Sequence, residues 1–347
     1  MKGGIAMHGR RLAALLLAGV LSGLLASPGA AQVRYRLQMA GVLSYEQNLP
    51  VFAALAQGFY EQEGVEVTRL VFGSGGAMRT AMMAKEFDFG YFAFVHVPLA
   101  RLGGSPWKAV LALHDREIFS LVVRNELKEQ VKRVEDLRGR TVGFSLPGAG
   151  SWMAANVFLR KAGLDPERDV RFLPLGGDPG VIYSAIRTGR VDAFSSWEPT
   201  TTRVLLEGLA YAIVRAWSDR DHREWYGSDR SLSLMLVTRE DVIQRDPDLV
   251  GRVVRATRKG LEYVRSTSPE RLATELMDHP RTREYFTGLQ RPFVVEMFRR
   301  IRGGFGTGCL SRRGFEAQMR LAVQYQVVRQ PIPFEEFADT RWAGACP

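Results

Sequence analysis

The sequence contains few of the residues that build metal centres or catalytic thiols. Its 347 residues include two cysteines, Cys309 and Cys346, and five histidines. Neither cysteine has a histidine or a second thiol at zinc-ligand spacing, so we expect no zinc site, no thiol catalysis and no cofactor. Two cysteines in an exported chain favour a disulfide between them, and two free thiols are the alternative.

Motifs for common enzymatic reactions are also missing. The chain has no Gly-Lys-Ser/Thr phosphate loop and no Gly-x-Ser-x-Gly nucleophile turn. Beyond His8, the histidines are His96, His114, His222 and His279, and no two of them stand at metal-ligand spacing. An acid/base pair of Glu198 with His96 or His114 remains the enzymatic alternative, and we expect a protein without enzymatic activity.

Positive charge is in excess but is not concentrated. Lys and Arg number 47 against 37 Asp and Glu, which gives a formal net charge of +10. The basic residues are scattered and form no block, so we do not expect nucleic acid binding; an anionic ligand or an acidic partner is compatible with the charge.

Long apolar runs are absent apart from residues 12–26. This run follows Lys2, Arg10 and Arg11 and precedes the small residues 29–31, the pattern of a cleavable signal peptide over 1–31. A membrane anchor is the alternative, but the run is shorter than the roughly 20 residues that cross a bilayer. No cysteine lies near the cleavage point, so we expect a soluble periplasmic product without a lipid anchor.

The remaining chain is longer than one hydrophobic core usually spans, so we expect two lobes. Residues 49–67 predict a helix, a turn and a strand, with Gly58 ending the helix and Gly64 reversing the chain. The loop 73–76 then exposes backbone N–H groups at the start of the next helix, a position suited to an anion or a polar ligand.

A second copy of this order follows. Residues 141–145 predict a strand, 147–151 a Gly/Ser loop and 152–162 a helix. Asp178 and Pro179 predict another helix start, and a strand bearing a single Asp comes one helix later in each half. The repetition indicates two similar α/β lobes, with ligand contacts beyond the carboxyl ends of their strands.

Four collinear segments resemble the nitrate, sulfonate, taurine and thiamine-precursor binding proteins, which are solute-binding subunits of bacterial ABC importers. The segments are residues 57–67, 86–90, 135–142 and 189–199, and the resemblance extends over about 33–202. It implies a type II periplasmic-binding-protein fold, with two α/β lobes, two crossover connections and a ligand cleft between the lobes. The implied partners are a small-molecule ligand, an ABC permease and its ATPase, and the implied state is a monomer. The implied division is lobe I over 32–123, lobe II over 124–230, and a return to lobe I with C-terminal helices over 231–347.

The resemblance also implies a pocket built from loops of both lobes. The matching residues are Ser44, Tyr45, Gln47, Ser74, Gly75, Gly76, Tyr91, Phe92, Ala93, Phe94, Gly148, Gly150, Ser151, Trp152, Trp197 and Glu198. An acidic Glu198 at the cleft favours a ligand with an amine or a heterocyclic N–H over an inorganic anion. A sulfonate, a thiamine-pyrimidine precursor and an aromatic carboxylate remain open, as does a ligand-sensing domain of a membrane receptor.

Overall fold

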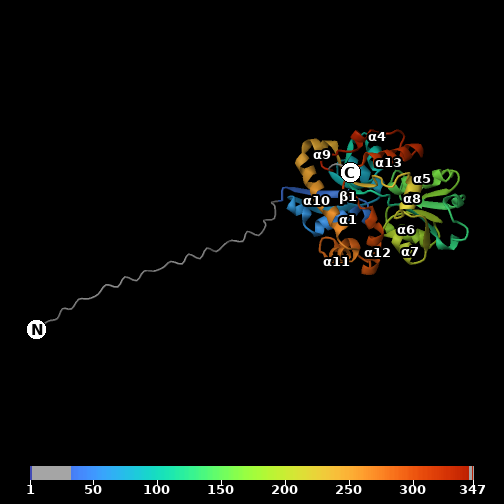
Figure 1. The fold of residues 1–347 in the computed structure, drawn as a ribbon, viewed down its shortest axis with the longest axis horizontal. Helices are drawn as coiled ribbons and strands as arrows, with labels where there is room; N and C mark the ends of the chain where they lie inside the picture. The colour runs from blue at the N-terminus through green and yellow to red at the C-terminus, as the bar shows by residue number, and fades with distance from the viewer. Residues whose placement is uncertain (2–32, 344–345, 347) are drawn as a thin grey trace. The chain divides into compact units, whose positions relative to one another are not determined.

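The computed structural model describes residues 33–343, together with Met1 and Cys346 (Figure 1). The predicted signal peptide lies outside the described residues, apart from Met1. Among the helices that are described, none has both the length and the apolar composition needed to cross a bilayer.

Two five-stranded sheets form the cores of two lobes, as predicted (Figure 1). The first sheet contains, in spatial order, β2 (Val65–Phe72), β1 (Tyr35–Gly41), β3 (Phe89–Ala93), β10 (Leu234–Arg239) and β4 (Trp107–His114). The second contains β7 (Arg171–Pro174), β6 (Thr141–Phe144), β8 (Ala193–Ser196), β5 (Ser120–Arg124) and β9 (Ala210–Val214). The fold is therefore the two-lobe α/β fold that the repeated sequence pattern predicts.

The two sheets share one topology. In the first, β1 pairs in parallel with β2 and β3, and β10 is antiparallel to β3 and β4. In the second, β6 pairs in parallel with β7 and β8, and β5 is antiparallel to β8 and β9. The chain enters the second sheet between β4 and β5 and returns with β10. Residues 120–123, which the predicted division places in lobe I, thus pair within the second sheet.

Helices cover both sheets. The early helices are α1 (Tyr45–Ala56), α2 (Phe59–Gln62), α3 (Gly75–Met83) and α4 (His96–Leu102). Those of the second half are α5 (Gly150–Lys161), α6 (Pro179–Arg187), α7 (Thr200–Leu206) and α8 (Asp219–Tyr226). The C-terminal ones are α9 (Glu240–Arg245), α10 (Pro247–Ser266), α11 (Pro269–Asp278), α12 (Arg291–Ile301), α13 (Arg312–Gln324) and α14 (Phe334–Phe337). Short 3-10 turns occupy Asn125–Leu127, Val134–Leu137, Arg283–Phe286 and Arg302–Gly304.

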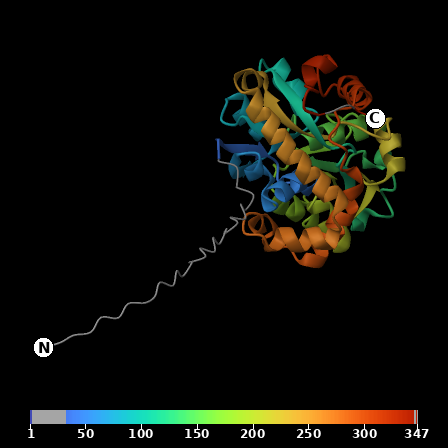
Figure 2. The ribbon, with the colours of Figure 1, turned by 60° about the vertical axis from the view of Figure 1, so that its left-hand side comes forward.

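The helix predicted from Leu49 is α1, which begins four residues earlier and carries Pro50 within it. It is followed by Gly58 with a φ of 66°, a left-handed conformation that glycine adopts without strain. The long helix α10 lies across the first lobe (Figure 2) and packs closely on α1. A Cβ built on Gly260 would lie 2.1 Å from the carbonyl oxygen of Pro50, so only glycine permits this approach. The stretch that begins at Leu49 is therefore buried scaffold.

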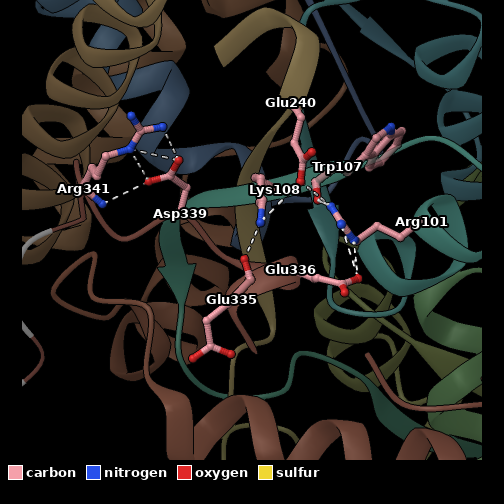
Figure 3. A network of polar contacts seen from close by, with 8 residues as sticks. All are labelled: Arg101, Trp107, Lys108, Glu240, Glu335, Glu336, Asp339 and Arg341. Atoms are coloured by element: carbon pink, nitrogen blue, oxygen red, sulfur yellow. Dashed lines mark hydrogen bonds and ion pairs between the residues drawn. The ribbon is translucent and has the colours of Figure 1, made fainter. Parts of the chain in front are cut away.

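The C-terminal segment is fixed to the outer strand of the first sheet. Arg101 bridges Glu240 at 2.8 Å and Glu336 at 3.3 Å (Figure 3). Beside this ion-pair network, the N–H of Asp339 donates to the carbonyl oxygen of Ala109 at 2.9 Å. The predicted disulfide between Cys309 and Cys346 is confirmed.

Candidate ligand-binding site

A narrow cavity lies where the loops of the two sheets face each other. Its first wall comes from lobe I and comprises Val42, Ser44, Gln47, Gly75, Ala93, His96 and Leu234. Its second wall comprises Ile118, Phe119, Ser145, Ala149, Gly150, Ser151, Gly177 and Trp197. Most of these residues follow the carboxyl end of a strand, the edge at which open α/β sheets bind ligands.

Two helices begin at the cavity, one from each lobe. Helix α3 starts at Gly75, and Ser74 caps it by accepting a hydrogen bond from the N–H of Ala77. Helix α5 starts at Gly150 and has no side-chain cap. Free N–H groups and the positive ends of both helix dipoles are therefore directed to the same space.

The polar side chains that line the cavity are uncharged in kind: serine hydroxyls, the amide of Gln47, His96 and Trp197. Trp197 is 3% exposed, and no residue of the described structure accepts a hydrogen bond from its Nε1–H. The hydroxyls of Ser145 and Ser151 lie 2.7 Å apart, and Ser151 also accepts from the N–H of Ser145. Within the described residues, no Lys, Arg, Asp or Glu lines this cavity.

Contacts across the cavity show that the lobes are closed. Arg79 of α3 donates to the carbonyl oxygen of Gly148 at 2.7 Å. A Cβ built on Gly177 would lie 2.9 Å from the Cα of Ser74, so the two backbones nearly touch. Only about 30 Å³ of the cavity can hold the centre of a water molecule, so a solute enters after the lobes separate.

A second cavity adjoins the first at Ile118 and is strongly polar. It is lined by Glu46, His114, Arg116, Glu117, Ser120, Glu198, Thr201, Ala216, Trp217, Arg300, Ile301 and Gly304. The backbone N–H of Glu198 donates to Oε1 of Glu46 at 2.8 Å, and Arg300 lies 3.9 Å from Glu198. Burial raises the pKa of both carboxyl groups, and the charge of Glu198 further raises the pKa of Glu46.

A sequence comparison assigns the chain to a family. The profile described as NMT1/THI5 like matches residues 46–271. The chain belongs to the NMT1/THI5-like family. A riboflavin-binding protein, RibY, of Chloroflexus aurantiacus is 25% identical over 267 residues, which are 75% of this chain and 71% of that protein.

Solved structures confirm the fold of this NMT1/THI5-like chain. A Bordetella bronchiseptica RB50 protein superposes with a TM-score of 0.76 at 20% identity, covering 89% of this chain and 95% of that one. The alkanesulfonate-binding protein SsuA of Xanthomonas axonopodis pv. citri gives 0.68 at 16%, covering 84% and 94%. The periplasmic nitrate-binding protein NrtA of Synechocystis PCC 6803 gives 0.66 at 14%, covering 84% and 82%. The resemblance inferred from the four sequence segments is therefore confirmed.

The structure brings part of the predicted pocket together. The predicted residues that line the first cavity are Ser44, Gln47, Gly75, Ala93, Gly150, Ser151 and Trp197. Three others border it: Ser74 caps α3, the carbonyl of Gly148 accepts from Arg79, and Gly76 faces the carbonyl oxygen of Pro147. The glycine and serine loops predicted from both lobes thus meet at one cavity.

The predicted aromatic residues, Trp197 excepted, serve mainly as packing. Tyr45 packs against Phe286 and donates to the carbonyl oxygen of Tyr285 at 2.6 Å. The remaining residues of this kind are Tyr91, hydrogen-bonded to Tyr60; Phe92, packed on Trp107; Phe94, packed on Phe337; and Trp152, packed against the hydrophobic core that contains Phe94 and Trp107. Glu198 lines the second cavity instead of the first. These aromatic side chains therefore lie outside the lining of the first cavity.

Several cavity residues were not predicted. Ser145 and Gly177 each follow the carboxyl end of a strand, so the rule that selected Ser44 applied to them as well. The two crossings between the sheets carry Ile118, Phe119 and Leu234. Their position at the cavity depends on β5 pairing in the second sheet and β10 pairing in the first. The predicted division includes the return to lobe I from residue 231, but it does not indicate that residues of the crossings line the cavity.

Proposed function

We propose that this protein is the periplasmic solute-binding subunit of an ABC importer. The observation that carries the proposal is the first cavity, which both lobes line and on which two helix N-termini converge. A solute that touches both walls stabilises the closed form over the open one, because closure is favoured only by differential affinity. Family membership supports the proposal, as do the relatives named for binding riboflavin, alkanesulfonate and nitrate.

The solute is a small organic molecule that the protein delivers, as a monomer, to a membrane permease with its own ATPase. A ligand amine was expected because of Glu198, but that carboxyl group faces the second cavity, where Thr202 donates to it twice. A sulfonate, a carboxylate or a carbonyl-bearing heterocycle therefore gains over an amine.

Acid/base catalysis has little structural support. His114 shares the second cavity with Glu198, but its Nδ1 lies 2.6 Å from the carbonyl oxygen of Arg116 and its Nε2 3.2 Å from that of Ile301. Burial lowers the pKa of His114 to about 4, which makes the ring a poor proton acceptor at pH 7. The two cysteines are joined to each other and line neither cavity.

Native mass spectrometry of protein isolated gently from the periplasm tests this function. We expect a bound solute that dissociates on denaturation, and a melting temperature that rises when the solute is added back, as linkage requires. Deletion of the gene should abolish uptake of the same solute. Chemical conversion of the solute by the isolated protein would contradict the proposal.

A further inference from the structure

His96 is the first residue of α4, and its buried ring lines the first cavity. Its Nδ1 lies 3.3 Å from Nη1 of Arg79. The same Nη1 donates to the carbonyl oxygen of Gly148 in the opposite lobe at 2.7 Å. Arg79 therefore contacts His96 and the second lobe with one nitrogen.

This contact fixes the protonation of the imidazole. A guanidinium group only donates hydrogen bonds, so Nδ1 of His96 must be the acceptor. A neutral imidazole that accepts at Nδ1 carries its proton on Nε2. Burial, and secondarily the charge of Arg79, lowers the pKa of His96 well below its usual value, so the ring stays neutral at physiological pH.

The Nε2–H edge of His96 lies beside Gly75. A Cβ built on Gly75 would be 2.6 Å from Nε2, so glycine at this position leaves the Nε2–H edge uncovered by a side chain. No hydrogen bond within the described chain uses Nε2, and the same holds for Nε1–H of Trp197 in the second wall. Two side chains whose N–H has no partner among the described residues, His96 from the first lobe and Trp197 from the second, therefore line one cavity.

We propose that His96 is the specificity-determining donor of the site, paired with Trp197, and that the enclosed end of the ligand presents hydrogen-bond acceptor oxygens. This inference rests on the proposed function and adds the chemical class of its ligand. A sulfonate, a carboxylate and a ring carbonyl all offer such atoms, whereas an ammonium group offers only donors and would leave both N–H groups unpaired. Arg79 joins His96 to the carbonyl oxygen of Gly148 in the opposite lobe, so the contact that orients His96 spans both lobes.

Calorimetric titration with matched probes tests the ligand class. The probes are p-toluenesulfonate and benzoate as anions, 7,8-dimethylalloxazine as a neutral ring carbonyl, and benzylammonium as the cation matched to benzoate. We expect an acceptor-bearing probe to bind and benzylammonium to bind at least tenfold more weakly. Comparison of the two anionic probes with the neutral probe shows whether the site prefers the oxygens of an anionic group or those of a ring carbonyl. Equal or tighter binding of benzylammonium, or no binding by any acceptor probe, would overturn the inference.

Variants of His96 test the donor itself. His96→Phe keeps a ring but has no N–H, and we expect it to weaken binding of the best probe about tenfold or more. His96→Gln retains a side-chain N–H and should stay within about threefold of the wild type. Equal affinity in His96→Phe and wild type would overturn the role of His96 and leave solute capture intact. If the wild-type protein bound none of the probes and carried no co-purified solute, the proposed function itself would be wrong.

Nitrogen NMR of the intact protein tests the tautomer without any substitution at His96. Between pH 5.5 and 8, the ¹⁵N shifts should show a protonated Nε2 and an unprotonated Nδ1. In Arg79→Met the acceptor constraint on Nδ1 is gone, and we expect a mixture of tautomers. A proton on Nδ1 of the closed wild-type protein would overturn the proposal.

Discussion

The backbone N–H of Glu198 in the second lobe donates a 2.8 Å hydrogen bond to the carboxyl group of Glu46 in the first. Ser44 donates to the other oxygen of Glu46 at 2.6 Å. Both carboxyl groups are buried, and burial raises the pKa of each above its ordinary value of 4.5. The junction between the lobes therefore contains two acids that are easier to protonate in the folded protein than in the unfolded chain.

The raised pKa values of Glu46 and Glu198 predict that these two groups contribute less to the free energy of unfolding as the pH rises. Above about pH 4.5 the folded state binds more protons than the unfolded state, so the free energy of unfolding falls until the pH passes the raised pKa values. Each group that loses a whole proton on unfolding contributes about 1.4 kcal/mol per pH unit to this fall. Denaturant unfolding of the wild type between pH 5 and 8 measures the slope. Glu46→Gln should flatten it, whereas Glu335→Gln, at a fully exposed ion pair, should leave it unchanged. Buried His96 and His114, whose pKa values are lowered, contribute the opposite slope below about pH 6.5, so the test is the difference between proteins. Equal slopes in the wild type and in Glu46→Gln would refute the assignment.

Trp197→Phe removes one N–H and keeps an aromatic ring against Phe119, whose centroid lies 6.2 Å away. We expect ligand affinity to fall about fivefold or more, because an acceptor on the ligand loses its partner. Calorimetric titration measures this loss. The matched control is Trp225→Phe, which lies outside both cavities and packs on Phe158. Equal affinity in the two variants would remove Trp197 from the site.

Gly75→Ala tests the close approach between α3 and His96. The added methyl group would meet Nε2 of His96 at 2.6 Å and must displace the ring or the helix start, so we expect the Kd to rise at least tenfold. Gly76→Ala is the control, since its Cβ would have its nearest neighbour at 3.7 Å. A thermal-shift series with the ligand compares the two. Similar ligand-induced shifts in both variants would show that the space beside His96 is not used.

The disulfide predicts a change in stability without a change in binding. Cys309 and Cys346 are 37 residues apart, and the loop they close corresponds to about 4 kcal/mol in the chain-entropy model. The double serine variant should unfold at lower denaturant concentration by up to that amount. Its ligand affinity should match the wild type, because neither cysteine lines the cavities. Reduction of the disulfide in the wild type should lower its stability by the same amount. A lower ligand affinity in the double serine variant would show that the disulfide also affects the site.

The sequence was sufficient for the architecture because local signals agreed with each other. The strand predicted after Gly64 is β2, and Asp178 caps α6 by accepting from the N–H groups of Gly180 and Val181. Such features depend on neighbouring residues alone, so spacing reveals them. The glycine and serine loops could be found for the same reason, since they follow strands directly.

The remaining parts of the site depend on contacts between distant residues. The predicted division has the chain return to lobe I from residue 231, but Phe119 and Leu234 reach the cavity only because β5 pairs in the second sheet and β10 in the first. Tyr45 and Glu198 were predicted at the pocket, and their side chains instead face Phe286 and the second cavity. The direction of a side chain at a loop is set by tertiary packing, which no local pattern encodes.

A crystal structure with the tightest-binding probe would show directly whether the two N–H donors hold the ligand. We expect ligand density between His96 and Trp197, with an acceptor oxygen within hydrogen-bond distance of Nε2 and Nε1 and both lobes closed around it. Density at another surface, or a ligand that turns a donor group toward His96, would contradict the two-donor site.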